Sequence, residues 1–109
     1  MVFNRPWGSF KIIQQTKMIT ILPEHELSLQ YHDHRCESWR VICGSGTLVF
    51  GIGTTQQLRP LKLGDCVLIT RKTIHRAIAG INGLTILESA SGDVDENDIT
   101  RLADKYGRV

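Results

Sequence analysis

The chain has 109 residues, enough for one compact domain built around one hydrophobic core. Its hydrophobic fraction of 41% and charged fraction of 22% are ordinary for a soluble globular protein, and its formal net charge of +2 gives no electrostatic case for nucleic-acid binding. No apolar run approaches membrane-spanning length and the first residues do not form a signal peptide, so neither nucleic acid nor a membrane is expected as a partner.

Short runs rich in Ile, Val, Leu and Thr, bounded by Gly, Pro, Asn and Asp, predict β-strands along most of the chain. Tight turns are expected at Gly44-Ser45-Gly46 and, as a hairpin tip, at Ile81-Asn82-Gly83. Many short strands at near-regular spacing indicate a closed antiparallel barrel or sandwich, in a single domain spanning residues 1–109. The predicted strands are Phe10–Ile13, Met18–Leu22, Leu27–His32, Glu37–Cys43, Thr47–Gly51, Gln57–Leu61, Asp65–Thr70, His75–Ala79 and Leu84–Ser89.

The C-terminal segment has a different pattern from the strands before it. Asp95-Glu96-Asn97-Asp98 offers acidic groups and N-cap candidates, and Ile99, Leu102 and Tyr106 follow at helical spacing. We therefore expect a short helix or helical turn there, packed on the barrel.

The three cysteines, Cys36, Cys43 and Cys66, form an odd number without a Cys-x-x-Cys pair. This usage favours reduced thiols in a cytoplasm over a disulfide framework. Cys43 and Cys66 lie in apolar strand runs, where we expect them to be packing residues.

The run from Ser28 to His34 carries the most chemical information. In an extended strand, alternate side chains share a face, so Gln30, His32 and His34 are predicted to point the same way. A strand face lined by an amide and two imidazoles indicates a polar pocket that holds a metal ion. The alternative is a pair of solvated or hydrogen-bonded histidines.

Two residues further along the chain can complete such a site. A carboxylate at Glu37 can supply a third ligand, and His75 lies at the end of a later strand run. His25 lies in a polar turn and is expected to be solvated.

These residues resemble the two sequence motifs of the cupin superfamily. The first motif corresponds to His32-x-His34-x2-Glu37-x6-Gly44, and the second to Gly64-x5-Thr70-x4-His75. The resemblance implies an all-β cupin barrel, a double-stranded β-helix or jelly roll, with its metal ligands at His32, His34, Glu37 and His75. Zinc is expected from nitrogen and oxygen ligation, although manganese, iron, cobalt or nickel would suit the same ligands.

Three segments in order also resemble the cupin domain of type II mannose-6-phosphate isomerases. They run from Arg5 to Phe10, from Leu27 to Trp39 and from Asp98 to Arg108. That family often carries this domain behind a mannose-1-phosphate guanylyltransferase domain. No glycine-rich phosphate loop of the sugar-nucleotide type occurs here, so guanylyltransferase activity is not expected. The resemblance implies a freestanding, metal-dependent isomerase that interconverts mannose 6-phosphate and fructose 6-phosphate.

Such an isomerase needs a base near a carbon-bound proton. Glu88, at the end of an apolar strand, is the candidate base, and its alternative role is that of a strand-end salt-bridge partner. Glu37 could serve as base instead of ligand. Gln30 could bind the metal or orient the sugar, or be a hydrogen-bonded pocket residue.

The phosphate group of the substrate needs cations, and one guanidinium group can bind two phosphate oxygens at once through bidentate hydrogen bonds. Arg35 and Arg76 adjoin ligand candidates, and Arg71 and Lys72 fill a turn expected at the barrel mouth. The alternative for each cation is simple solvation. The candidate phosphate-binding residues are Arg35, Arg71, Lys72, Arg76 and Arg101.

Each of the two tryptophans has two alternative roles. Trp39 could form a pocket wall or pack in the core, and Trp7 could cover a barrel end or a partner subunit. A homodimer is expected from the resemblance, since small cupins commonly pair by their sheets. Such pairing would also cover the strand carrying Phe10, Ile12 and Ile13, which would otherwise be an edge.

Two other function classes compete with the isomerase. One is a non-catalytic metal-binding cupin that binds or senses a small sugar-like ligand. The other is an oxidative cupin that uses iron and oxygen, in which phosphate-binding arginines would have no purpose.

Overall fold

The computed structural model of the chain describes residues 2–13, 16–52, 55–92 and 97–108. These residues contain strands and turns but no helix, and accordingly none that is long and apolar enough to cross a membrane. The strands are β1 (Val2–Arg5), β2 (Gly8–Ile13), β3 (Thr16–Ile21), β4 (Leu29–Tyr31), β5 (Arg35–Ile52), β6 (Thr55–Leu61), β7 (Cys66–Ile69), β8 (Ile74–Gly92) and β9 (Thr100–Ala103).

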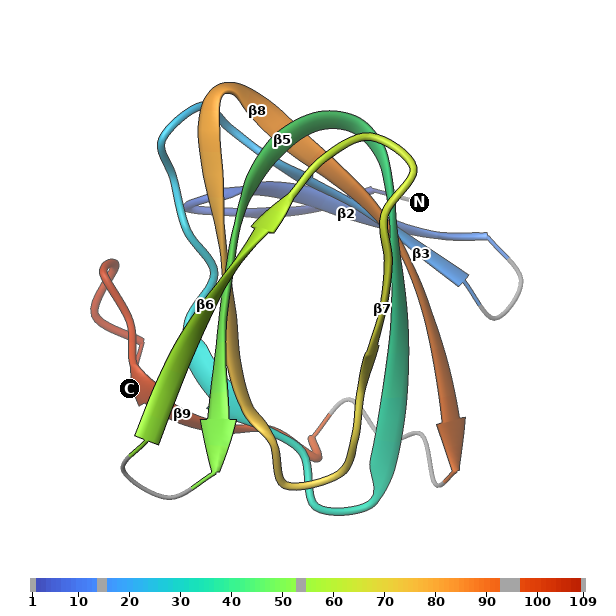
Figure 1. Cartoon of the computed structure of the whole chain (residues 1–109), viewed down its shortest axis with the longest axis vertical. Coiled ribbons are helices and arrows are strands. Elements are labelled where there is room, and N and C mark those ends of the chain that lie inside the picture. The colour runs from blue at the N-terminus through green and yellow to red at the C-terminus, as the bar shows by residue number, and fades with distance from the viewer. Residues whose placement is uncertain (1, 14–15, 53–54, 93–96, 109) are drawn as a thin grey trace.

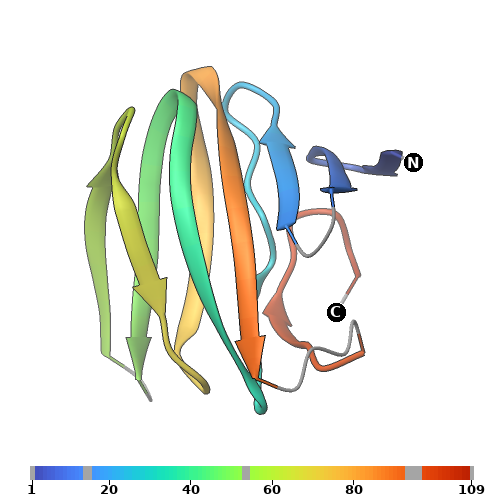
Figure 2. The same cartoon turned by 90° about the vertical axis from the view of Figure 1, so that its right-hand side faces the viewer.

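The strands form one nine-stranded sheet that curls around on itself (Figure 1). One path runs in the order β1-β2-β3-β8-β4-β9, and β5 joins β8 to β6 and β7. Every pairing is antiparallel, as the spacing of the short strand runs predicted. In Figure 2, the N-terminal strands and β9 lie on one side of the curled sheet, away from β6.

The two expected turns are wrong, because β5 and β8 continue through them as a long pair that bends together (Figure 1). The pairing register shifts on both sides of Gly44, where β5 bends. Gly44 and Gly83 adopt φ angles of +77° and +78°, which glycine tolerates best. A Cβ atom on Gly44 would lie only 2.1 Å from the Gly83 carbonyl oxygen. The glycines at this bend permit close backbone contact between β5 and β8, and they do not form turns that reverse the chain direction.

The predicted C-terminal helix is also wrong. Thr100–Ala103 forms β9, in which Thr100 pairs with Tyr31 and Arg101 pairs with Gln30 on β4. The free edge of β4 offers backbone hydrogen bonds to this segment, and they replace the bonds of a helical turn. Asp95 and Glu96, the expected capping residues, lie outside the described residues.

The inward face of β5 changes in character along its length. Arg35, Glu37, Trp39 and Val41 alternate inward and are all buried. Trp39 and Val41 join the hydrophobic core with residues such as Ile86, whereas Arg35 and Glu37 bring charge into the same interior. One end of the interior is therefore apolar and the other is polar.

The cysteines do not pack as expected. Cys43 and Cys66 are both exposed and Cys36 is half-buried, and all three are free thiols. Cys66 pairs with Arg40, which is also exposed, so both lie on the outer face of the sheet. Apolar neighbours in a strand run therefore did not indicate burial for these two residues.

The bend gives a first prediction. Gly44→Ala should lower the free energy of unfolding by about 1–3 kcal/mol more than Gly64→Ala, because it adds a clash with the neighbouring strand. Gly64 is the matched control, since its φ is +90° but an added Cβ there meets nothing within 4 Å. Denaturant unfolding measures both losses, and equal losses would show that the close contact at the bend has no energetic role.

Candidate functional site

Three buried side chains from different parts of the chain meet inside the curled sheet. His32 follows β4, Glu37 lies on β5 and His75 lies on β8. The His32 Nε2 atom lies 3.4 Å from Glu37 Oε2, and the His75 Nε2 atom lies 3.4 Å from Glu37 Oε1. One potential ligand atom from each residue lies within 4.8 Å of the others.

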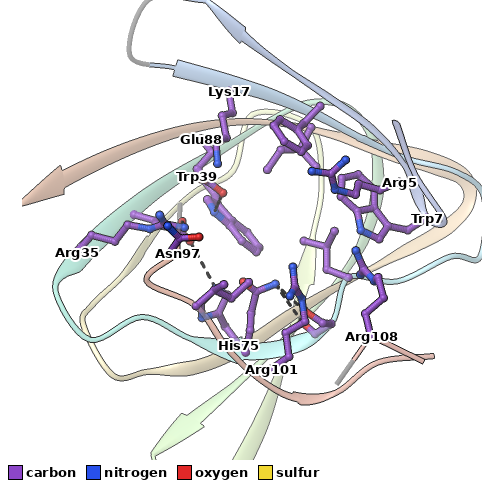
Figure 3. Close-up of a pocket in the computed structure, with 17 residues that line it drawn as sticks. Arg5, Trp7, Lys17, Arg35, Trp39, His75, Glu88, Asn97, Arg101 and Arg108 are labelled. Atoms are coloured by element: carbon purple, nitrogen blue, oxygen red, sulfur yellow. Dashed lines mark hydrogen bonds and ion pairs between the residues drawn. The ribbon is translucent and has the colours of Figure 1, made fainter. Parts of the chain in front are cut away.

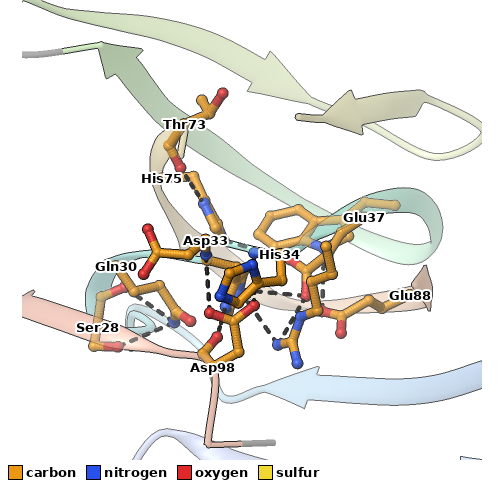
Figure 4. A network of polar contacts seen from close by, with 12 residues as sticks. Ser28, Gln30, Asp33, His34, Glu37, Thr73, His75, Glu88 and Asp98 are labelled. Atoms are coloured by element: carbon orange, nitrogen blue, oxygen red, sulfur yellow. Dashed lines mark hydrogen bonds and ion pairs between the residues drawn. The ribbon is translucent and has the colours of Figure 1, made fainter. Parts of the chain in front are cut away.

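Both imidazole rings are oriented by hydrogen bonds to backbone carbonyls, and Figure 4 shows that of His75 to Thr73. The His32 Nδ1 atom lies 2.6 Å from the Asp98 carbonyl oxygen, and His75 Nδ1 lies 2.8 Å from the Thr73 carbonyl oxygen. Because a carbonyl only accepts, each Nδ1 donates to it and each Nε2 is turned toward Glu37, where it would be available to a metal ion. Metal-binding histidines are commonly oriented in this way.

Asp98 is a site residue that the sequence did not reveal. Its carboxylate accepts the backbone N–H groups of Asp33 and His34, each at 2.9 Å. The hydrogen bond from Asp33, followed by that from His34, holds the pKa of Asp98 below its usual value. The sequence suggested only an N-cap role, whereas in the fold Asp98 ties the start of β9 to the loop that carries His32.

The three side chains fit a divalent metal ion. Two donors bonded to one tetrahedral ion at about 2.1 Å lie roughly 3.4 Å apart, and each histidine Nε2 lies at this distance from one of the two Glu37 oxygens. Glu37 Oε1 is buried without a hydrogen-bond partner among the described residues, so a ligand bond would satisfy it. Three protein ligands would leave a position open for a substrate oxygen.

His34 is not brought to this group. The chain bends at Asp33 and His34, between β4 and β5, and His34 is exposed. The alternation that predicted a shared face with His32 therefore ends at Tyr31, because only an extended strand keeps the two-residue period. Among the described residues, the group able to hold a metal is His32, Glu37 and His75.

A second acid, Glu88, lies buried beside this group. Its Oε2 atom accepts a hydrogen bond from Trp39 Nε1 at 3.2 Å. Burial, followed by repulsion from the nearby Glu37 carboxylate, raises the pKa of Glu88 to about 8. Burial alone would also raise the pKa of Glu37, but contacts with His32 and His75 outweigh it and hold that pKa far below its usual value. Glu37 is thus charged at neutral pH, whereas Glu88 mostly carries a proton.

Arg35 completes the polar end of the interior. Its Nη2 atom lies 3.2 Å from Glu37 Oε2 and 3.4 Å from His32 Nε2. Arg35 is buried, so its guanidinium contributes to neutralising the Glu37 carboxylate in a region of low dielectric.

A cavity of about 320 Å³ opens beside these residues (Figure 3). This volume lies at the lower end of the range of roughly 300–1,000 Å³ typical of small-molecule sites. Gln30 lines the cavity and donates its amide N–H to Ser28 Oγ at 3.0 Å. The other predicted site residues that line it are Arg35, Glu37, Trp39, His75, Glu88 and Arg101.

Three predicted phosphate-binding residues do not line the cavity. Arg71 and Lys72 are exposed in the turn before β8. Arg76 follows the inward-facing His75, so strand alternation turns it to the opposite face. There it donates to the carbonyl oxygens of Leu27 and Ala103 at 3.0 and 3.2 Å, which makes it a tie between segments.

Residues from the ends of the described chain line the cavity instead. Trp7 is buried there, and its predicted role in covering a barrel end or a partner subunit stays a prediction. The motif spacing around the histidines did not indicate the remaining lining residues, although two of them, Arg5 and Arg108, lie in segments that carry the family resemblance. The lining residues that were not predicted as site residues include Arg5, Trp7, Lys17, Asn97 and Arg108.

The sequence matches a family model described as "Mannose-6-phosphate isomerase C-terminal" over residues 1–104. The alginate biosynthesis protein AlgA of Pseudomonas aeruginosa is 38% identical over 112 aligned residues, which cover 96% of this chain and 22% of that protein. A mannose-1-phosphate guanylyltransferase of Escherichia coli is 33% identical, with 96% of this chain and 23% of that protein covered. The chain therefore spans less than a quarter of the length of these relatives.

Solved structures show that the fold is that of the cupins, as the two motifs predicted. The capsular polysaccharide assembling protein CapF of Staphylococcus aureus superposes with a TM-score of 0.81 at 16% identity, covering 95% of this chain and 32% of CapF. The 3,4-ketoisomerase QdtA of Thermoanaerobacterium thermosaccharolyticum gives a TM-score of 0.68 at 16% identity, covering 93% of this chain and 82% of QdtA.

The geometry predicts which histidines a metal needs. His32→Ala and His75→Ala should each abolish stoichiometric binding of a divalent metal, because each removes one of three ligands. His34→Ala is the matched control and should retain the metal, since His34 is exposed. Elemental analysis of purified, folded variants measures this, and loss of metal from His34→Ala would restore His34 as a ligand.

The state of Glu88 predicts a pH dependence of stability. The pKa of Glu88 is about 8 in the folded protein and 4.5 in the unfolded chain, so the folded protein binds the Glu88 proton more tightly. The stabilisation of the fold by this proton is complete below pH 4.5 and is lost as the pH rises through about 8. In chelator-treated protein, the wild type should lose on the order of 2–3 kcal/mol more unfolding free energy than Glu88→Gln between pH 6 and pH 9.

Glutamine has a similar shape but cannot ionise, so the unfolding free energy of Glu88→Gln lacks the decrease that ionisation of Glu88 causes. Urea unfolding at several pH values provides the comparison. Parallel pH profiles for the two proteins would mean that Glu88 is already ionised at pH 6.

Proposed function

Because the chain belongs to the mannose-6-phosphate isomerase C-terminal family, we propose that it is a metal-dependent isomerase that interconverts mannose 6-phosphate and fructose 6-phosphate. The observation that carries the proposal is the pair of buried acids in one cavity, Glu37 in the metal-fitting group and Glu88 with its raised pKa. We further propose zinc as the metal, with manganese, iron, cobalt or nickel as alternatives.

The reaction moves a proton between two neighbouring carbons through an enediol. A divalent ion held by His32, Glu37 and His75 would polarise the sugar oxygens on those carbons. Glu88 is the group that takes and returns the proton. With a pKa of about 8, roughly one tenth of it is ionised at pH 7 and its acid and base forms interconvert readily. The hydrogen bond from Trp39 Nε1 holds its carboxyl group in place.

Two further side chains act on the sugar. Arg35 places a positive charge beside the reacting carbons, where it would stabilise negative charge that develops on the enediol oxygens. Gln30 lies on β4, paired with His75, and its amide would orient a sugar hydroxyl or join the metal ligands. Trp39 forms one wall of the cavity, and its ring lies edge-on to His75 with the centroids 5.6 Å apart.

The scope of the proposal follows from the length of the match. The chain corresponds to 22–23% of the relatives described above, so the guanylyltransferase activity in the name of the Escherichia coli protein is not proposed for it. A cytoplasmic location and a homodimer remain part of the proposal. The competing function is a metal-binding cupin that binds a sugar-like ligand without converting it.

A coupled assay tests the activity. The purified protein with a divalent metal should convert mannose 6-phosphate to fructose 6-phosphate, and Glu88→Gln should lower kcat by about 100-fold or more while keeping its metal. Glu24→Gln is the control, because Glu24 is exposed and absent from the cavity lining. No turnover with zinc, manganese, cobalt, nickel or iron would favour the binding function.

A further inference from the structure

The charge of the cavity lining points to an anionic ligand. Five lining residues are cationic, namely Arg5, Lys17, Arg35, Arg101 and Arg108, whereas two are acidic. The walls therefore carry a net positive charge that exceeds what is needed to balance the Glu37 carboxylate.

Three of the five cations lie apart from Arg35 in the cavity. Figure 3 shows Arg5 and Arg108 on the side of Trp7 and Arg101 beside His75, whereas Arg35 lies on the opposite side from Trp7. Arg5 comes from β1, Arg101 from β9 and Arg108 from the segment after β9. Folding thus brings both ends of the chain to one side of the site.

Strand pairing places this group of arginines relative to the metal-fitting group. Gln30 on β4 pairs with His75 on β8 and with Arg101 on β9. Directly paired residues share a face of the sheet, and two strand spacings put the Cα atoms of His75 and Arg101 about 10 Å apart. All three line the cavity, with Gln30 between the other two.

Arg101 and Arg5 keep their charge available for a ligand. Arg101 Nε is buried and has no hydrogen-bond partner among the described residues. Arg5 donates to the carbonyl oxygen of Asn4 at 2.8 Å and lies over the Phe10 ring, 5.1 Å from its centroid. Within the described ranges, neither guanidinium pairs with a carboxylate, and a buried N–H group without an acceptor is unfavourable until a ligand supplies one.

Arg108 is held in position by Asp104. Its Nε atom donates to Asp104 Oδ2 at 2.7 Å, and its Nη2 atom donates to Oδ1 at 3.2 Å. This bidentate pair fixes the plane of the guanidinium and leaves the Nη1 donors for another acceptor. A fixed guanidinium loses little conformational freedom when it binds an anion.

We propose that Arg5, Arg101 and Arg108 bind the phosphate group of the sugar phosphate, at the end of the cavity away from Glu88. The inference rests on the proposed function in placing the reacting carbons at His32, Glu37 and His75. A 6-phosphate is remote from C1 and C2 of a hexose, so the two ends of the ligand would meet the two ends of the cavity. Arg101 belongs to the set predicted from the sequence, and Arg5 and Arg108 join it here in place of Arg71, Lys72 and Arg76.

Calorimetric titration tests the assignment without requiring turnover. Inorganic phosphate, mannose 6-phosphate and mannose are titrated into wild type, Arg5→Gln, Arg101→Gln and Arg108→Gln. Each variant should bind both phosphate compounds at least about tenfold more weakly and should keep its metal content. Arg40→Gln is the matched control, because Arg40 is exposed on the outer face of β5.

Substitution by lysine provides a second measurement. Arg101→Lys should recover only part of the lost affinity, because an ammonium group cannot reproduce the planar fork of a guanidinium. If Arg101→Gln does not fold, Arg5→Gln decides, since Arg5 is exposed and its substitution leaves the core intact. Wild-type affinity for mannose 6-phosphate in both Arg5→Gln and Arg101→Gln would overturn the proposal.

The two proposals can fail separately. If the variants lose phosphate affinity but the wild type converts no sugar, the phosphate site stands and the isomerase proposal falls. If the wild type turns over mannose 6-phosphate and the arginine variants keep its KM, the isomerase stands and the phosphate site falls. An increase in KM larger than the decrease in kcat supports both.

Discussion

The structure of the site depends on one buried negative charge, the Glu37 carboxylate. A carboxylate that is only 2% exposed is costly unless charges and hydrogen-bond donors surround it. His32, His75 and Arg35 all approach its two oxygens within 3.4 Å. The same charge acts on Glu88, whose ionisation would place a second negative charge nearby. Burial first, and then this nearby charge, keep Glu88 mostly protonated at neutral pH, so the site holds one charged and one mostly protonated acid.

The C-terminal segment holds this arrangement together. The Asp98 carbonyl accepts a hydrogen bond from the His32 ring, and its carboxylate accepts hydrogen bonds from the backbone of the loop that follows His32. The pairing of β9 with β4 brings Arg101 beside Gln30. A helix in this segment would satisfy its own backbone groups and would leave the edge of β4 unpaired. Strand β9 therefore forms part of the site.

The cavity draws on residues from most of the described chain. The lining of the cavity extends from Arg5 to Arg108, so residues from nearly the whole chain contribute to it. The relatives are more than four times longer, since the match covers 22–23% of their length. The matched segment thus carries a pocket with its own acids and cations.

The sequence by itself determined the features that depend on local order and on residue chemistry. Alternation and turn residues predicted an antiparallel all-β fold, and ligand chemistry with the family resemblance selected His32, His34, Glu37 and His75 as ligands and Glu88 as a candidate base. Only the tertiary structure decided that His34 and Arg76 point away, that Gly44 bends a strand instead of reversing it, and that Thr100–Ala103 is a strand. The physical reason is that the two-residue period holds only within an extended segment. Bends and free strand edges depend on backbone partners far away in the sequence, and so does the meeting of Arg5 with Arg108 in one cavity.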